Sequence, residues 1–210
     1  MAGNGRSLKQ ILESGEFIVA PGVFEMISAR VADQMGFHAL YMTGYGATAS
    51  YLGLPDAGIA AYSEMVDCAG RIAQGTVTPV IADADTGYGG LLNVQRTIQG
   101  YEAAGVQGIQ IEDQVTPKKC GHTLGREVVP LEDMVQKIQV ACDARRSEDT
   151  LIIARTDSRT DLGLDEALRR GEAFAKAGAD VVFVESPESE EELQKVGATI
   201  DAPLLANMVP

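Results

Sequence analysis

The sequence predicts an α/β fold, namely a TIM-type (β/α)8 barrel, and three observations favour it. Apolar runs of strand length alternate along the chain with segments of helical periodicity. Runs such as VVFV and LIIA are apolar on both faces, as expected of parallel strands covered by helices. Charged or amide residues end successive runs, which places polar side chains at the C-terminal ends of the strands.

An open doubly wound sheet would show the same alternation. Such a sheet concentrates its site at one switch point, whereas a barrel gathers residues from all strand ends around one mouth. The polar residues here are spread over successive strand ends: Asp83 and Asp85, Glu112 and Asp113, Arg155 and Asp157, Glu185, and Asn207. This distribution favours the barrel.

Strands and helices are expected in strict alternation. The predicted strands are 17–20, 38–43, 79–83, 107–112, 150–155, 180–185 and 203–207. The predicted helices are 24–36, 63–75, 91–104, 132–146, 165–177 and 189–198. Glycines such as Gly178 stop the helices just before the next strand.

Residues 1–210 are expected to form a single barrel domain, because no linker or low-complexity tract interrupts the pattern. Barrels of this type usually need about 250 residues. The chain ends directly after its seventh predicted strand. We therefore expect the eighth strand and the last helices to be missing from this sequence.

Composition excludes several classes of partner. A formal net charge of −13 would repel nucleic acid and anionic membranes. No stretch is long and apolar enough to span a bilayer, and the N-terminus has no signal pattern, so a cytoplasmic location is expected. Cys68, Cys120 and Cys142 form no CxxC pair and have no metal-ligand spacing, so neither disulfides nor a zinc site are expected.

The motif VIADADTGYGG carries two carboxylates at a strand end. Asp83 and Asp85 are two residues apart and would project to the same side if the strand continues that far. Such a pair suits Mg²⁺, which takes one or two protein oxygens and keeps several waters. A glycine-rich turn or a helix cap is the alternative. Glu112 and Asp113 at the next strand end favour the metal.

The Gly44-Tyr45-Gly46 stretch lacks the third glycine and the distant acid of a dinucleotide-binding motif. Its backbone N–H groups, with Thr43 and Tyr45, could cradle a carboxylate or an oxyanion. A tight turn that holds Tyr45 in the core is the alternative.

Cys120 stands beside Lys118, Lys119 and His122, and nearby positive charge stabilises a thiolate. A solvated loop with a surface histidine is the alternative.

Arg155 ends an apolar strand, where a guanidinium needs carboxylate partners. It either pairs with Asp157 or Glu185, or binds a substrate carboxylate. Asp56 is a turn residue or an outer partner of the metal.

These segments together resemble the isocitrate lyase and phosphoenolpyruvate mutase superfamily. The motifs are TGYG, LPDAG, DADTGYGG, IEDQVTPKKCGH, ARTDS, ESP and ANM, in the order of the family. The resemblance implies a (β/α)8 barrel, usually a homotetramer whose subunits exchange a C-terminal helix. It also implies small carboxylate substrates bound through Mg²⁺, which Mn²⁺ could replace.

Carried over by motif, the resemblance also implies roles for individual residues. Asp85 would be the principal metal ligand, while the residues that hold its waters would be Asp83, Asp56 and Glu112. The keto-acid part of the substrate would meet Thr43, Gly44, Tyr45 and Arg155. The remainder of the substrate would meet Glu185, Asn207, Gly121 and His122. Lys118 to His122 would form a mobile loop, with Lys118, Cys120, His122 and Arg155 as the catalytic group.

The resemblance is nearest to the branch with methylisocitrate lyase, 2,3-dimethylmalate lyase and petal death protein, because the lyase form Lys-Lys-Cys-Gly-His is intact. It implies retro-aldol cleavage of a 2-alkylmalate or a 2-methylisocitrate-like acid to pyruvate or another 2-keto acid, with Cys120 as general acid. Three alternatives stay open: an oxaloacetate hydrolase or decarboxylase, a phosphonomutase, and an inactive incomplete barrel. The resemblance implies Ser at position 130 in oxaloacetate hydrolases, and this chain has Pro130 there. This difference argues against the oxaloacetate hydrolase.

Overall fold

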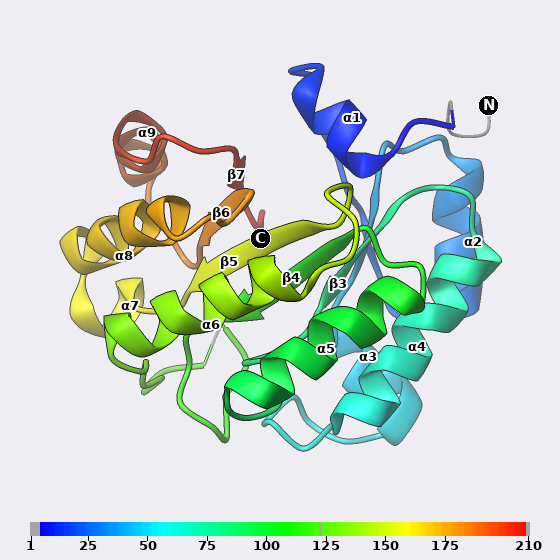
Figure 1. Ribbon diagram of the computed structural model, residues 1–210, viewed down its shortest axis with the longest axis horizontal. Coiled ribbons are helices and arrows are strands. Elements are labelled where there is room, and N and C mark those ends of the chain that lie inside the picture. The colour runs from blue at the N-terminus through cyan, green and yellow to red at the C-terminus, as the bar shows by residue number, and fades with distance from the viewer. Residues whose placement is uncertain (1–4, 122, 209–210) are drawn as a thin grey trace.

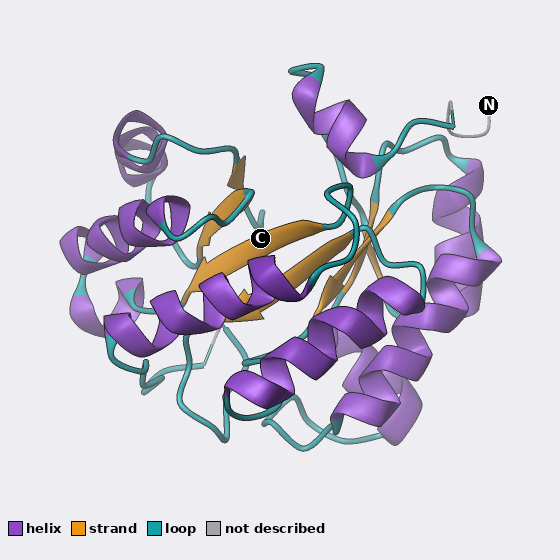
Figure 2. Ribbon diagram, viewed as in Figure 1, coloured by secondary structure: helices purple, strands orange, loops and turns teal. Residues whose placement is uncertain are grey.

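The computed structural model describes residues 5–121 and 123–208. Its centre is a sheet of seven strands, and helices cover the outer face of that sheet (Figures 1 and 2). The strands are β1 (Gly22–Val23), β2 (Leu40–Met42), β3 (Val80–Asp83), β4 (Gly108–Glu112), β5 (Leu151–Thr156), β6 (Val181–Val184) and β7 (Leu204–Leu205). The helices are α1 (Leu8–Glu13), α2 (Met26–Gln34), α3 (Gly44–Ala47), the π-helix η1 (Thr48–Leu52), α4 (Tyr62–Gly75), α5 (Leu91–Ala103), α6 (Leu131–Ala144), α7 (Arg159–Leu162), α8 (Leu164–Lys176) and α9 (Glu190–Thr199).

The strand order confirms the barrel-type prediction. Each strand pairs with the strand before it, and all six pairs are parallel. A doubly wound sheet would instead reverse its strand order at a switch point. Within the described residues β1 and β7 are the two edges, so the seven strands form a half-barrel.

The first predicted strand, 17–20, is wrong. Phe17 is 86% exposed and Val19 is 50% exposed. Pairing with β2 begins only where the carbonyl of Pro21 accepts a hydrogen bond from the amide of Tyr41 at 3.0 Å. The apolar run that suggested a strand lies before this point and has no neighbouring strand to pair with, so β1 is Gly22–Val23.

The six predicted helices are confirmed with shifted ends, as α2, α4, α5, α6, α8 and α9. The short helices α1, α3, α7 and η1 were not predicted. Each has only four to six residues, which is too few to produce a helical hydrophobic period. No helix of the described residues is both long and apolar enough to cross a membrane.

Two apolar clusters lie on opposite faces of the sheet. Ala82 and Ile152 belong to the larger cluster beneath the helices, whereas their neighbours Ile81 and Ile153 belong to the smaller, inner cluster. Leu8 of α1 joins the inner cluster, and its amide donates to Oε1 of Gln107 at 2.8 Å. Because Gln107 precedes β4, α1 covers the N-terminal ends of the strands and leaves their C-terminal ends free for a site.

We predict that Leu40→Ala lowers the free energy of unfolding by about 2–5 kcal/mol, because Leu40 is fully buried in β2 and its loss leaves a cavity. Leu92→Ala is the matched control, since Leu92 is 81% exposed and its loss should change the free energy by no more than about 0.5 kcal/mol. Urea unfolding followed by circular dichroism measures both. Equal losses in the two variants would contradict the burial described here.

Candidate functional site

Polar side chains gather at the C-terminal ends of the strands. Asp83 ends β3, Glu112 ends β4, Arg155 lies near the end of β5, and Glu185 follows β6. A cavity of about 920 Å³ opens along the inner face of the sheet and reaches from this end to Leu8. Its polar end is lined by Tyr41, Thr43, Gly44, Tyr45, Asp56, Asp83, Lys118, Cys120, Gly121, Arg155 and Asn207.

Asp83 is held in place by its neighbours. Its Oδ1 accepts hydrogen bonds from Nε2 of Gln110 at 3.2 Å and from the amide of Asp85 at 3.0 Å. The hydroxyl of Tyr41 donates in turn to Oε1 of Gln110. On the other side lies Gly44, where a Cβ atom would collide with Oδ2 of Asp83. Glycine at position 44 therefore lets the chain pass close to this carboxylate.

Asp85 is not part of the strand. β3 ends at Asp83, although the amide of Ala84 and the carbonyl of Asp85 still form hydrogen bonds with β4, each at 2.9 Å. Asp85 takes a left-handed conformation with φ of 46° as the chain turns. Strand alternation was expected to align Asp83 and Asp85 only if the strand continued that far, and this condition is not met. The charge of Asp83 nevertheless acts on Asp85, whose amide donates to the Asp83 carboxylate and whose own carboxylate reaches Lys118.

Lys118 lies between two carboxylates. Its Nζ is 2.6 Å from Oδ1 of Asp56 and 2.9 Å from Oδ1 of Asp85, and its side chain is only 4% exposed. Burial alone would lower the pKa of Lys118, but the charges of Asp83 and Asp85 outweigh burial and raise it. The ammonium group therefore stays charged, and the alternative of a solvated loop lysine is wrong for this residue.

The carboxylates around Lys118 carry a surplus of negative charge. Burial and then the charge of Asp83 raise the pKa of Asp85 to about 7. Burial also raises the pKa of Glu112. Oε1 of Glu112 is buried without a hydrogen bond from any described residue, and Oδ1 of Asp85 is buried against the ammonium of Lys118 at 2.9 Å. Asp56 and Asp85 thus share the ammonium of Lys118, while the charges of Asp83 and Glu112 also act on it.

This donor set fits a hard divalent cation. The described residues contain no group of three or more His, Cys, Asp or Glu side chains already close enough to hold a metal ion. Mg²⁺ needs only one or two carboxylates directly and keeps its remaining waters. Oxygen atoms that are buried, negative and lacking a donor are suitable partners for it and for those waters.

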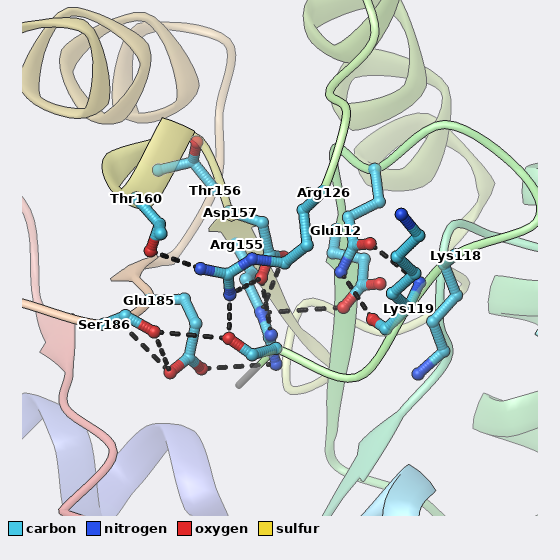
Figure 3. A network of polar contacts seen from close by, with 12 residues as sticks. Glu112, Lys118, Lys119, Arg126, Arg155, Thr156, Asp157, Thr160, Glu185 and Ser186 are labelled. Carbon is cyan, nitrogen blue, oxygen red and sulfur yellow. Dashed lines mark hydrogen bonds and ion pairs between the residues drawn. The ribbon is translucent and has the colours of Figure 1, made fainter. Parts of the chain in front are cut away.

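Arg155 is surrounded by three carboxylates (Figure 3). Its Nε and Nη2 donate to the two oxygens of Asp157 at 2.9 and 2.7 Å. Glu112 and Glu185 lie 3.5 and 3.4 Å from the guanidinium, which also rests over the ring of Phe183. The structural pairing of Arg155 is thus observed, and because the residue also lines the cavity, a substrate carboxylate can reach it.

Asp113 does not join Glu112 beside Arg155. Its Oδ2 accepts hydrogen bonds from Oγ1 of Thr156 at 2.8 Å and from Nη1 of Arg170 at 3.0 Å. Its Oδ1 accepts the amide of Asp157 at 2.9 Å. Asp113 therefore fixes the end of β5 against α8. The expectation that Asp113 favours a metal site is wrong.

Residues 115–127, which we call the cysteine loop, connect β4 to α6. An antiparallel bridge between Gln114 and Val128 closes the loop at its base. The side chain of Gln114 both accepts from the amide of Lys119 and donates to its carbonyl, each at 2.9 Å. Cys120 is half-buried and lines the cavity, and a Cβ atom on Gly121 would collide with Nη2 of Arg155. The loop therefore lies closely over the site.

The other predicted loop residues differ in position. Lys119 is exposed and its Nζ donates to the carbonyl of Gly125 at 2.6 Å, so only one of the two lysines reaches the carboxylates. His122 lies outside the described residues. Cys68 and Cys142 lie in α4 and α6, as expected, and all three cysteines are free.

Thr43 begins α3 and its Oγ1 accepts the amide of Gly46 at 2.9 Å. Within the described part of the chain, no hydrogen bond involves the amide groups of Gly44 and Tyr45 as donors. Tyr45 is 63% exposed, so the alternative of a core tyrosine is wrong. Asn207, also exposed, follows β7 and lines the same cavity.

Three residues of this region were not predicted. Gln110 is a fully buried polar residue inside an apolar strand, and this pattern in GIQIE is a signal that could have revealed it. Tyr41 reaches the cavity from β2. Arg126 is buried at the far end of the cysteine loop, and nothing in the sequence around it distinguishes it from an exposed loop arginine.

Comparisons with known proteins agree on one family. A family model described as phosphoenolpyruvate phosphomutase matches residues 8–210. The chain is 52% identical to a 2,3-dimethylmalate lyase of Eubacterium barkeri over 96% of this chain and 70% of that protein. It is 46% identical to a 2-methylisocitrate lyase of Aeropyrum pernix over 97% of this chain and 65% of that protein.

A solved structure of oxaloacetate acetylhydrolase with the inhibitor 3,3-difluorooxalacetate superposes with a TM-score of 0.91 at 42% identity. The match covers 94% of this chain and 69% of that one. The chain thus spans between 65% and 70% of the length of these three relatives.

We predict that Gly44→Ala destabilises the fold by about 1–3 kcal/mol, because the added methyl group must displace the carboxylate of Asp83 or move α3. Gly197→Ala in α9 is the control. It has open space around it and should be neutral or stabilising by up to about 1 kcal/mol. Thermal and urea unfolding measure both variants, and an unchanged stability of Gly44→Ala would refute the close approach.

Proposed function

Because the chain belongs to the phosphoenolpyruvate mutase and isocitrate lyase superfamily, we propose that it is a Mg²⁺-dependent carbon–carbon lyase. Its substrate would be a 2-hydroxy acid of the 2-alkylmalate or 2-methylisocitrate type, and its products pyruvate or another 2-keto acid and a carboxylate. The observation that carries this proposal is one cavity lined by Asp56, Asp83, Lys118, Arg155 and the thiol of Cys120. The carboxylates of Asp85 and Glu112 contact two of these residues, Lys118 and Arg155.

The carboxylates would hold the metal. Asp85 would bind it directly, and the residues that would hold its waters are Asp83, Asp56 and Glu112. A bound Mg²⁺ supplies Lewis acidity that lowers the pKa of the substrate hydroxyl. Support for this comes from Oε1 of Glu112, which is buried without a hydrogen bond from any described residue, and from Oδ1 of Asp85, which is buried against Lys118. Mn²⁺ would be accepted in its place, because it prefers the same oxygen ligands.

The chain would orient the substrate from two sides. The amide groups of Gly44 and Tyr45, with Thr43, would bind the carboxylate of the forming keto acid, together with Arg155. Glu185, Asn207 and Gly121 would contact the other half of the substrate. His122, which lies outside the described residues, would join them on the strength of the family likeness.

Cleavage would leave the electron pair of the broken carbon–carbon bond on the carbon next to the departing carboxylate. The substrate hydroxyl would give its proton to a carboxylate of the Asp56, Asp83, Asp85 and Glu112 group, and the carbon that carried the hydroxyl would become the keto carbon. Sγ of Cys120 would deliver a proton to the carbanion carbon, and Arg155 would stabilise its charge. Lys118 would balance the carboxylates, and the closed cysteine loop would keep water from the carbanion.

A panel of substrates tests the reaction class. The purified protein with Mg²⁺ is assayed against 2-alkylmalates, 2-methylisocitrate, oxaloacetate and phosphonopyruvate, and 2-keto acid release is followed. We expect a 2-keto acid from a 2-hydroxy acid. Oxalate formed from oxaloacetate would instead favour an oxaloacetate hydrolase. This alternative is tested because the chain resembles the oxaloacetate acetylhydrolase structure. Turnover of phosphonopyruvate alone would favour a phosphonomutase.

We extend the proposal to the domain organisation, oligomeric state and location of the protein. The family likeness suggests a single-domain homotetramer that works in the cytoplasm. Light scattering of the purified protein measures the assembly, and a stable monomer would contradict it.

We predict that Cys120→Ser lowers kcat for cleavage by about 10²–10⁴-fold, because a hydroxyl is a far weaker acid than a thiol. Cys142→Ser is the control, because Cys142 lies in α6 away from the cavity and donates only to the carbonyl of Gly178. Steady-state kinetics measure both. Full activity of Cys120→Ser would disprove the role of Cys120.

We predict that chelation with EDTA abolishes cleavage and that Mg²⁺ restores it. Mg²⁺ should also raise the melting temperature of the chelated protein, because a ligand that binds only the folded state stabilises it. Asp85→Asn should lose this rise, whereas Asp201→Asn, an exposed control, should keep it. A rise in Tm that persists in Asp85→Asn would place the metal elsewhere.

A further inference from the structure

Arg126 is the buried arginine of the cysteine loop. Its side chain is 2% exposed, although its neighbours Gly125 and Glu127 are exposed. Burying a guanidinium is costly unless acceptors surround it. A loop that folds an arginine inward at this cost must form compensating contacts.

The guanidinium of Arg126 joins three segments (Figure 3). Nη1 donates to the carbonyl of Gly121 within the loop and to Oδ1 of Asp157 beyond β5, the latter at 3.1 Å. Nη2 donates to Oγ1 of Thr160 in α7. The arginine therefore connects the middle of the loop to two elements of the half-barrel.

Asp157 is shared between two arginines. Its Oδ1 accepts from Arg126 and also from Nη2 of Arg155 at 2.7 Å. Burial would raise the pKa of Asp157, but Arg155 and then Arg126 outweigh burial and lower it. One ionised carboxylate thus links the loop arginine to the arginine that lines the cavity.

The contact with Gly121 places the loop over the site. The same carbonyl accepts a hydrogen bond from Oγ of Ser186 at 3.3 Å, and the Cα of Gly121 lies against Arg155. Cys120 precedes Gly121 and lines the cavity. Whatever holds the carbonyl of Gly121 therefore also limits where the thiol of Cys120 can lie.

We infer that Arg126 is a positioning residue that latches the cysteine loop to Asp157 and Thr160 and so holds Cys120 over the cavity. Its importance for turnover rests on the proposed function, in which Cys120 is the proton donor. The latch itself is a property of the free protein. It can therefore be tested without any substrate.

The test is the alkylation of Cys120 by iodoacetamide, followed by peptide mass spectrometry so that each cysteine is measured separately. Arg126→Gln removes the charge and most of the contacts, and we expect Cys120 to react about tenfold faster. The rate at Cys142, which lies in α6, should not change. Glu127→Gln, an exposed change in the same loop, is the matched control and should leave both rates unchanged.

Thr160→Val is a milder second variant in case Arg126→Gln fails to fold. It removes only the acceptor of Nη2, and Cys120 should react about two- to threefold faster. Arg126→Lys keeps the charge but cannot reach all three acceptors, so its rate should fall between those of the wild type and Arg126→Gln. An unchanged Cys120 rate in a folded Arg126→Gln, or in Thr160→Val where the former does not fold, would overturn the latch.

Kinetics separate positioning from a merely structural role. If the loop must close for proton delivery, Arg126→Gln should lower kcat about tenfold with little change in KM, and Arg126→Lys should recover part of the loss. Equal kcat in wild type and Arg126→Gln would overturn the positioning role. A wild-type protein without lyase activity but with the expected alkylation pattern would count against the proposed function and leave the latch standing.

Discussion

Buried carboxylates at one end of the sheet require nearby positive charge, and this requirement determines how that end of the molecule is arranged. Charge taken out of water is costly unless it is paired. The buried carboxylate side chains there are Asp56, Asp83, Asp85, Glu112, Asp113, Asp157 and Glu185. All of them except Asp83 form ion pairs with described residues, and the cations in these pairs are Lys118, Arg126, Arg155 and Arg170. Because two of these cations belong to the cysteine loop, the loop and the strand ends depend on each other.

The fold could be read from the sequence because its signal is repeated along the chain. Strands buried on both faces, such as β5 and β6, give continuous apolar runs, and the helices between them have a clear period. The prediction failed at 17–20, where an apolar run has no strand beside it. It also missed α1, α3 and α7, which are shorter than the period that would reveal them.

The residues of the candidate site that lie at strand ends could be predicted from the sequence. The residues whose positions depend on the path of a loop could not. Parallel strands bring their ends to one edge, so Asp83, Glu112 and Arg155 could be grouped from sequence. Which way Asp113 turns, and which of Lys118 and Lys119 is buried, depends on contacts with α8 and with Asp56 that no local pattern contains. The roles of these residues in turnover stay predictions.

The carboxylate that Arg126 and Arg155 share also limits how such a protein can evolve. Loops tolerate replacement more readily than the scaffold that carries them, and new chemistry arises on old folds by changing loops. Here, a change at position 126 that removes the cation would also loosen the position of Arg155. Asp157, which holds the Arg155 guanidinium, would lose one of its two arginine partners. Variation in the cysteine loop is therefore expected to spare a cation that can reach Asp157, while the residues around that point diverge toward other substrates.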